Sequence, residues 1–575
     1  MQHSKSIIMT TALKKTKMRL IPICLFLLAI EFNLLAQTTI IITDPPYNAI
    51  CDGTSDDVLA VQLAINALNN GDTLIIPGPT GIGAPGLSVN GKMNITIKGS
   101  GTNAGFYALT GNYAHISGLT LSRTMLRIIN SDSVVVKDLL FEGNENDFIP
   151  VCFGNTEYCE ILSCEVRHTR GNGSWPAHAA LAGISSINSR HLKVADNYVH
   201  DLFGDTPTEG PRGIWLGGVA PAENDNFVVV SNNIVENTNM TGITVHGPNY
   251  LLFDNYIYNT GGAGIKIEVS VDDTTGLIHV FNNTLVKHFF HGVQLGISAP
   301  NVVLRNVVIE NNYIDSIQNS GVRVFAYVVN LTVRDNIIMN TALKNCINGY
   351  NFGEGGIYVT GQLKNASFTG NIISSGNNSG SCGQGIGLDN FDPPFNFAQI
   401  QNIDIRENEI SKIKYHGIRI RTSSNSQPMD SIFIECNTFD IIDIAALQIE
   451  NGGSNVGFVS WCWNTIGMVP DTFNLIGYNT NNLYSSCLPC DTLTNLTEIK
   501  NSEMNIKVYP NPVRDKLFIS NLNKPFEYAI VDIYGRSILG GRNSDFISVN
   551  SLTNGIYTIV IRAENVQKSF RFIKH

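Results

Sequence analysis

The sequence predicts an all-β chain whose central part is a solenoid of stacked coils. One observation is a series of asparagines, 22 to 37 residues apart, each followed within two residues by an apolar β-former: Asn197, Asn233, Asn255, Asn283, Asn312, Asn336, Asn371, Asn408, Asn437 and Asn464. The other is a glycine followed by alternating apolar and polar residues, at Gly213, Gly242, Gly264, Gly292, Gly321, Gly356, Gly385 and Gly417. Such alternation indicates strands, and a short repeated unit buries its apolar face only by stacking on its neighbours.

The recurrent asparagines are predicted to form a ladder, one residue per coil, at the same turn of every coil. Asparagine tolerates the left-handed backbone conformation that tight turns require. We therefore expect the ladder residues themselves to adopt it.

The first 36 residues are predicted to be a signal peptide. Basic residues from Lys14 to Arg19 precede an apolar run from Ile21 to Ile30, and the cut is expected after Ala36. A membrane anchor is the alternative, but the run is shorter than the roughly 20 residues that span a bilayer, and Glu31 interrupts it. We expect a secreted or outer-surface protein.

The charge balance excludes binding to nucleic acid by charge alone. The chain has 38 basic and 48 acidic residues, a net charge of −10. Only 15% of residues are charged and 43% are hydrophobic, which also excludes a disordered polyanion. We expect a monomer that does not bind nucleic acid.

Cysteine usage is compatible with export. Of eleven cysteines, Cys24 lies in the predicted signal peptide, and some of the others are expected to pair in an oxidising compartment. Cys487 and Cys490 form an isolated C-x-x-C that lacks two further zinc ligands nearby, so a local disulfide or free thiols are expected there.

The N-terminal part of the solenoid resembles a known family. The segments 52–57 (DGTSDD), 61–65 (VQLAI) and 72–77 (DTLIIP) match the usual start of the pectin-lyase-like superfamily of right-handed parallel β-helices. The resemblance implies a β-helix over residues 37–483. Asp56 would cap a short helix that closes the open end of the coil.

The C-terminal residues differ from the repeats. Landmarks at 508–513 (VYPNPV), 531–536 (VDIYGR), 552–557 (LTNGIY) and 572–575 (FIKH) are similar to the type A C-terminal sorting domain of the type IX secretion system. The resemblance implies a small β-sandwich over residues 505–575 behind a linker at 484–504. It also implies that the type IX machinery is a partner, that the domain is removed, and that the mature protein is released or attached to the cell surface. The alternative is that this domain is an adhesive β-sandwich.

Because strands of successive coils lie about 4.8 Å apart, equivalent residues form columns. The first outward column is predicted to contain Trp215, Thr244, Lys266, Gln294, Arg323, Tyr358, Gly387 and Arg419. The second contains Gly217, His246, Glu268, Gly296, Phe325, Thr360, Asp389 and Arg421, and a weaker unit adds Gln448 and Glu450. The mixture of aromatic and charged groups favours a polysaccharide-binding groove; charges that only blunt an exposed sheet face are the alternative.

Two long insertions are expected to flank this groove as loops. One runs from Arg167 and His168 through Trp175, and the other from His200 and Asp201 to Arg212. Tryptophan and arginine on loops suit sugar faces and carboxylates. The predicted substrate-binding residues are Trp215, Gln294, His291, Tyr358, Asp389, Arg419, Arg421, Trp175 and Arg212.

Four residues of the columns are predicted to be catalytic. Glu268 would act as acid or base or hold calcium, Lys266 or His246 would be its proton-transfer partner, and Arg323 would neutralise a substrate carboxylate. The alternative is an ordinary Lys–Glu salt bridge on an exposed face.

The family resemblance leaves the reaction open. His291-Gly292 and residues 321–325 resemble two sequence motifs of polygalacturonases. Thr241 and Gly262-Ala263, however, occupy the positions where that family has aspartates. An inverting hydrolase needs two carboxyls about 6.5–9.5 Å apart. Lyases of the superfamily use Lys or Arg bases, often with calcium, for which Lys266 and Arg323 would serve. We expect a polysaccharide lyase or hydrolase with calcium as the one candidate cofactor; a non-catalytic carbohydrate binder or adhesin is the alternative.

Overall fold

The computed structural model describes residues 37–574 with internal gaps. These gaps are 84–85, 110–123, 147–148, 172–181, 205–209, 218–227, 270–276, 298–301, 345–353, 375–382, 391–398, 423–428, 453–455, 485–506, 510–512, 521–526, 533–536, 543–545, 554 and 564–565. The predicted signal peptide, Trp175, Cys487 and Cys490 therefore lie outside the described residues. The chain divides into two compact units, Met1–Cys487 and Leu488–His575.

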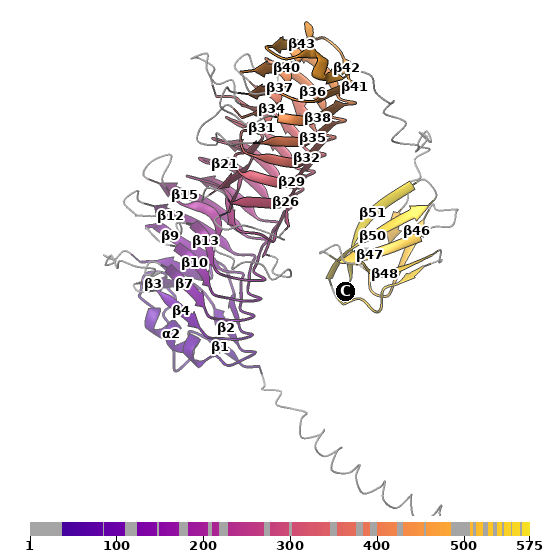
Figure 1. The fold of residues 1–575 in the computed structure, drawn as a ribbon. Coiled ribbons are helices and arrows are strands. Elements are labelled where there is room, and N and C mark those ends of the chain that lie inside the picture. The colour runs from indigo at the N-terminus through magenta and orange to yellow at the C-terminus, as the bar shows by residue number, and fades with distance from the viewer. Residues whose placement is uncertain are drawn as a thin grey trace, which may run out of the picture. The chain divides into compact units, whose positions relative to one another are not determined.

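The first unit is a parallel β-helix built from three sheets (Figure 1). Sheet A has sixteen strands, from β1 (Thr39–Ile41) to β44 (Leu483–Tyr484). Sheet B has fourteen, from β3 (Pro79–Ile82) to β42 (Thr465–Ile466), and sheet C has fourteen, from β4 (Leu87–Asn90) to β43 (Asp471–Ile476). From β2 to β43 each coil contributes one strand to each sheet in the order A, B, C, and β1 and β44 add one strand to sheet A at either end, so the predicted fold is confirmed.

The core is one continuous stack of aliphatic side chains inside the coil. Ile265 and Ile267 are 0% exposed, which confirms the predicted strand phase. The recurrent glycines mark the corner between sheets B and C. A Cβ at Gly242 or Gly356 would overlap the side chain of Ile257 or Ile373, so glycine is required where sheet C begins against the buried residues of sheet B.

The predicted asparagine ladder runs through the turn between sheets A and B. Asn312 is representative: its Oδ1 accepts from the backbone N–H and side-chain amide of Asn283, at 2.9 and 3.0 Å. Its Nδ2 donates to Val280 O and to Asn336 Oδ1, at 3.0 and 2.9 Å. These buried bonds give the polar groups of each turn hydrogen-bond partners on the preceding and following coils.

The ladder residues are not themselves left-handed, as we had expected. The positive φ lies on the residue immediately before each of them, for example Asn311 at 54° and Glu407 at 56°. Cys436 and Trp463 adopt it as well, so this position accepts several residue types. The asparagine is selected by the geometry of its side-chain amide and not by its backbone freedom.

Helix α2 (Val58–Ala67) covers the N-terminal coil. Asp56 Oδ1 accepts from Val58 N–H at 3.1 Å and from Gly83 N–H at 3.2 Å, which joins the start of the helix to the coil beside it. Val61, Ala64 and Ile65 are buried in the core of the solenoid. Among the described residues no helix combines the length and hydropathy needed to cross a bilayer.

The second unit contains two antiparallel sheets. One contains β45 (Lys507–Tyr509), β46 (Lys516–Ser520) and β49 (Ile547–Ser548). The other contains β48 (Ser537–Arg542), β47 (Glu527–Asp532), β50 (Gly555–Ala563) and β51 (Val566–Lys574). Leu517, Ile530, Ile559 and Phe572 from both sheets share one core.

Cys436 and Cys462, on adjacent coils of the β-helix, are disulfide-bonded. In the part of the chain that the structure describes, Cys51, Cys152, Cys159 and Cys164 are free. The expected pairing of some cysteines is therefore observed.

We expect Asn312→Ala to lower the free energy of unfolding by about 2–4 kcal/mol, because it leaves buried partners on both neighbouring coils without a hydrogen bond. Exposed Asn90 on β4 is the control, and Asn90→Ala should change stability by less than about 0.5 kcal/mol. Equal denaturant midpoints for the two variants would show that the ladder does not stabilise the coil.

Candidate functional site

The two outward columns predicted from the sequence exist in sheet C. They lie on β16 (Arg212–Gly217), β19 (Ile243–His246), β22 (Ile265–Val269), β25 (Val293–Ile297), β28 (Val322–Val324), β31 (Gly355–Val359), β34 (Gln384–Asp389), β37 (His416–Thr422) and β40 (Ala445–Asn451). Strand register pairs the first column in the predicted order, from Trp215 to Gln448. In the second column it pairs His246 with Glu268 and Asp389 with Arg421.

The two columns face outward, but several of their long side chains are buried. Tyr358 is 4% exposed, Arg419 5% and Arg323 9%. Stacking at the strand spacing makes each long side chain cover its neighbours in the column. Polar groups at this depth need partners, and the contacts among them define two clusters.

The first cluster centres on Glu268. Lys266 Nζ contacts Oε1 of its carboxylate, and His246 Nε2 lies 2.9 Å from Oε2. The Trp215 ring meets His246 edge to face, with centroids 5.4 Å apart. Lys266 reaches Glu268 from the same strand and His246 from the preceding coil.

Glu268 is held as a carboxylate. Burial alone would raise its pKa, but the hydrogen bond from His246 and the charge of Lys266 outweigh burial and lower the pKa to about 2. A group with this pKa does not deliver a proton near neutral pH. Glu268 therefore contacts His246 and Lys266 in its charged form.

The second cluster lies further along the same face. The Arg323 guanidinium lies 4.3 Å from the centroid of the Tyr358 ring and donates to Thr360 Oγ1 at 3.0 Å. The Tyr358 hydroxyl donates to Asp389 Oδ2 at 2.7 Å, and Arg421 Nη2 lies 2.6 Å from the same oxygen. Four residues predicted separately as ligand contacts thus form one connected network.

The sequence did not point to Glu354, which lies just before β31. Ser320 Oγ donates to its carboxylate, and Ser320 N–H donates to His291 Nδ1 at 3.2 Å. Burial raises the pKa of Glu354, and the charge of Arg323 opposes that effect. Burial lowers the pKa of His291 to about 3, so its imidazole is neutral. His291 and Ser320 each precede a recurrent glycine. That shared position is the feature of the sequence that could have predicted their contact.

Gln294 lies in register between Lys266 and Arg323, as predicted. Arg212, at the start of β16, belongs to the same face. Burial lowers its pKa, and the negative charge of Glu268 opposes that effect. Both residues therefore surround the Glu268 cluster.

The two insertions expected as loops begin as strands of sheet B. Arg167 and His168 lie on β12 (Glu165–Gly171), and His200 and Asp201 lie on β15 (Tyr198–Gly204). Arg167, His168, His200 and Asp201 therefore belong to sheet B and not to sheet C. Asp205 and Glu209 lie outside the described residues.

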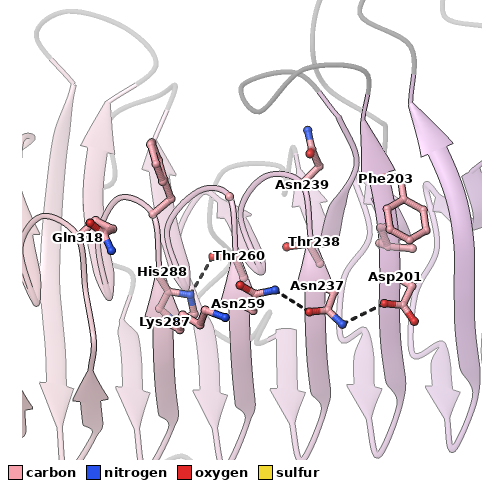
Figure 2. A pocket seen from close by; sticks show the side chains of 13 residues that line it. Asp201, Phe203, Asn237, Thr238, Asn239, Asn259, Thr260, Lys287, His288 and Gln318 are labelled. Carbon is pink, nitrogen blue, oxygen red and sulfur yellow. Dashed lines mark hydrogen bonds between the residues drawn. The ribbon is translucent and has the colours of Figure 1, made fainter. Parts of the chain in front are cut away.

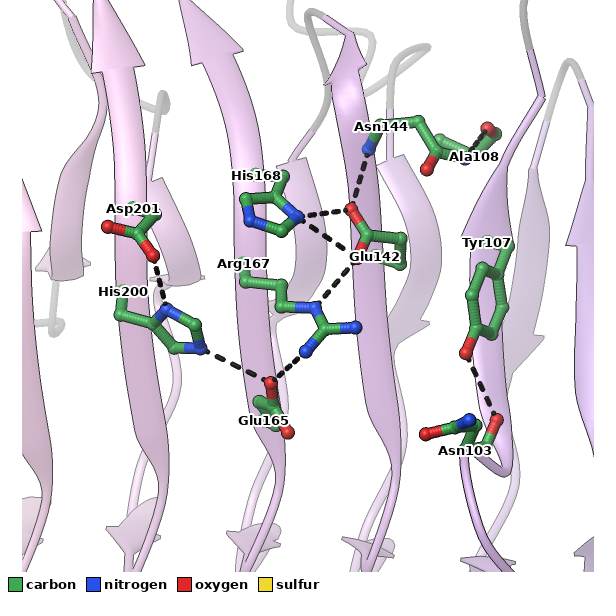
Figure 3. A network of polar contacts seen from close by, with 10 residues as sticks. All are labelled: Asn103, Tyr107, Ala108, Glu142, Asn144, Glu165, Arg167, His168, His200 and Asp201. Carbon is green, nitrogen blue, oxygen red and sulfur yellow. Dashed lines mark hydrogen bonds and ion pairs between the residues drawn. The ribbon is translucent and has the colours of Figure 1, made fainter.

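On sheet B these residues form a closed polar network with Glu142 of β9 (Leu140–Asn146) (Figure 3). Arg167 lies 2.7 Å from both Glu142 and Glu165, and His168 Nδ1 lies 2.9 Å from Glu142. His200 bridges Asp201, at 2.8 Å, and Glu165, at 3.2 Å. Each histidine is oriented by carboxylates of this network.

Glu268 does not fit a calcium site. Both of its oxygens already contact the nitrogens of Lys266 and His246, and calcium prefers six to eight oxygen ligands. Where the structure describes the chain, no group of three His, Cys, Asp or Glu side chains is placed to hold a metal ion. Asp272 and Asp273 lie outside the described residues.

Residues 507–575 match the family of secretion system C-terminal sorting domains. This confirms the sorting domain inferred from the C-terminal landmarks. The chain is therefore an exported, secreted or cell-surface protein with a parallel β-helix in front of its sorting signal. No curated protein matches the sequence.

Several solved structures are similar to this chain. Two A-modules of mannuronan C-5 epimerases from Azotobacter vinelandii are each 17% identical, with TM-scores of 0.42 and 0.44, covering 78% and 79% of this chain and 100% of theirs. An alginate lyase from Paenibacillus is 10% identical with a TM-score of 0.27, covering 76% of this chain and 99% of its own.

Glu268→Gln should change how stability depends on pH. The carboxylate has a lower pKa in the folded chain than its usual 4.5, so its stabilisation is complete above about pH 4.5 and is lost as the pH falls toward about 2. The variant should be less stable near neutral pH, and its difference from wild type should shrink on acidification. Denaturant midpoints across this range test it, with exposed Glu409→Gln as the control; a difference independent of pH would contradict it.

Deleting residues 505–575 should leave the protein in the periplasm, because the sorting domain is its signal for crossing the outer membrane. Cell fractionation and surface labelling of the full-length and truncated chains measure this. Normal surface display of the truncated chain would overturn the assignment.

Proposed function

We propose that this exported β-helix acts on an acidic polysaccharide on the outer face of sheet C, by abstracting a proton beside a uronate carboxylate. The observation that carries the proposal is the Glu268 carboxylate held between His246 and Lys266, in a face that also contains Arg323. Elimination and epimerisation both begin with that proton transfer.

His246 is the proposed base. Glu268 contacts its Nε2, which fixes the ring and stabilises the imidazolium formed when the other nitrogen takes a proton. Lys266 is the second candidate for this transfer. Its ammonium also lowers the charge of a bound uronate and makes the neighbouring C–H more acidic.

Arg323 is proposed to bind a substrate carboxylate. It lies two coils from Lys266, about 10 Å away at the strand spacing. In elimination the departing glycosidic oxygen would take its proton from Lys266, whose ammonium contacts Glu268. Glu354 lies four coils from His246, roughly 19 Å at the strand spacing, too far to serve the same sugar. Trp215, Gln294 and Arg212 would position the sugars around the cluster.

A hydrolase is less well supported. Inverting cleavage needs two available carboxyls. On this face Glu268 is held by Lys266 and His246, and Asp389 by Arg421. Glu450 is bound by Arg419 at 2.7 Å.

A non-catalytic carbohydrate binder is the second candidate. The buried pairing of Asp389 with Arg421 favours it, because such a network gives a rigid polar surface without chemistry. In that case the face would bind acidic chains and leave them intact.

The test is incubation of the mature protein with alginate, polygalacturonate and a neutral glucan. Unsaturated product from an acidic polymer supports elimination, and reducing ends alone would indicate hydrolysis. Changed uronate composition without cleavage would indicate epimerisation, and binding without any reaction would support the second candidate.

His246→Gln and Lys266→Ala should each lower turnover about 10²–10⁴-fold, because each removes a proton-transfer or charge-neutralising group. Each also removes a partner of the Glu268 carboxylate, so turnover is compared under conditions in which circular dichroism shows both variants to be folded. Glu450→Gln, several coils away, is the control and should mainly weaken substrate binding. Activity that survives both cluster variants would place the site elsewhere.

A further inference from the structure

A second feature lies outside sheet C, where strands of sheet B end (Figure 2). It is a hollow of about 530 Å³ lined by residues of β15, β18 (Ile234–Thr238), β21 (Tyr256–Thr260) and β24 (Thr284–His288) and by the turns that follow them. This volume is typical of ligand sites. We propose that this hollow binds a short segment of an acidic polysaccharide, separately from the Glu268 cluster.

The register of the coils explains the shape of the hollow. Leu202, Thr238, Thr260 and His288 pair across neighbouring strands, so the residues after them occupy equivalent positions: Phe203, Asn239, Gly261 and Phe289. The two phenylalanines are three coils apart, roughly 14 Å at the strand spacing. Asn239 and Gly261 lie between them, and because Gly261 has no side chain the trough is open beside Phe289.

The two rings are exposed to an unusual degree for phenylalanine. Phe203 is 45% and Phe289 48% exposed. Large exposed apolar side chains that border a polar hollow mark ligand sites, and aromatic faces stack on the C–H faces of sugar rings. Stabilisation of the coil does not explain them, because neither ring is buried.

The floor of the trough offers hydrogen-bonding groups in a row. Asn259 Nδ2 donates to Asn237 Oδ1 at 2.7 Å, and Asn237 Nδ2 donates to Asp201 Oδ1 at 3.0 Å. Asn237 and Asn259 have φ near 53°, which places successive amides along the direction of coil stacking (Figure 2). Sugar hydroxyls both donate and accept, so a row of amides suits them.

Lys287 makes the hollow selective for acidic sugars. It lines the hollow one coil beyond Asn259, and its Nζ lies 5.4 Å from the centroid of the Tyr258 ring. The carboxylate in the same wall, Asp201, is already bound by His200 at 2.8 Å. A uronate carboxylate would pair with the lysine while its ring stacks on Phe289.

This inference rests on the proposed function only for the class of ligand. The test therefore measures binding in the hollow separately from turnover at the Glu268 cluster. Calorimetry with acidic oligosaccharides would use the protein carrying His246→Gln, which prevents turnover. Phe203→Ala and Phe289→Ala should each weaken binding about tenfold or more. Phe473→Ala is the matched control, since Phe473 is 38% exposed on β43, and it should not change the affinity.

Lys287→Ala should weaken binding of acidic but not of neutral oligosaccharides. With His246 intact, the two phenylalanine variants should turn over short soluble substrates at the wild-type rate. Unchanged affinity in both phenylalanine variants, or no oligosaccharide binding at all, would overturn the inference. Phenylalanine-dependent binding without any turnover would overturn the proposed function and leave the hollow as a binding site.

Discussion

The parallel pairing of each coil with the next is the constraint on which the rest of this structure depends. It fixes a spacing of about 4.8 Å between equivalent residues, so each side chain contacts the same position one coil earlier and later. Inside the coil this produces columns of aliphatic residues, and at the turn between sheets A and B it produces the asparagine ladder. Outside, it determines which charges meet.

On sheet C the same spacing has an electrostatic consequence. Like charges at adjacent positions of one column would repel each other at short range, and the chain avoids this: Gln294 separates Lys266 from Arg323, and Asp389 is followed by Arg421. Because these groups are also largely buried, each carboxylate needs a cationic partner. The pairing that makes the column stable also holds Glu268 as a carboxylate.

The sequence predicts positions along the coil well, because the period of two and the recurrent glycine fix the strand phase; Ile265, Lys266 and Ile267 all lie as expected. It predicts poorly how deeply an outward-facing side chain is buried. The burial of Tyr358 and Arg419 depends on how long side chains cover one another, which alternation does not encode.

Two other features also required the three-dimensional structure. Arg167 and His200 continue strands of sheet B, although their segments depart from the repeat and suggested loops. Glu354 has no motif, and only the pairing of β28 with β31 brings it to Ser320. In both cases the missing information is which residues of neighbouring coils meet.

The coils that carry the Glu268 cluster also carry the corner hollow. β21 ends at Thr260 and β22 begins at Ile265, so one short turn joins Gly261 to Lys266. The next coil joins Phe289 to Gln294 in the same way, through the turn that contains His291. Because coil stacking holds each turn in register, the two sites have a fixed offset along the solenoid. A polymer bound in the hollow would therefore be presented to sheet C at a constant distance from His246, without any movement of the chain.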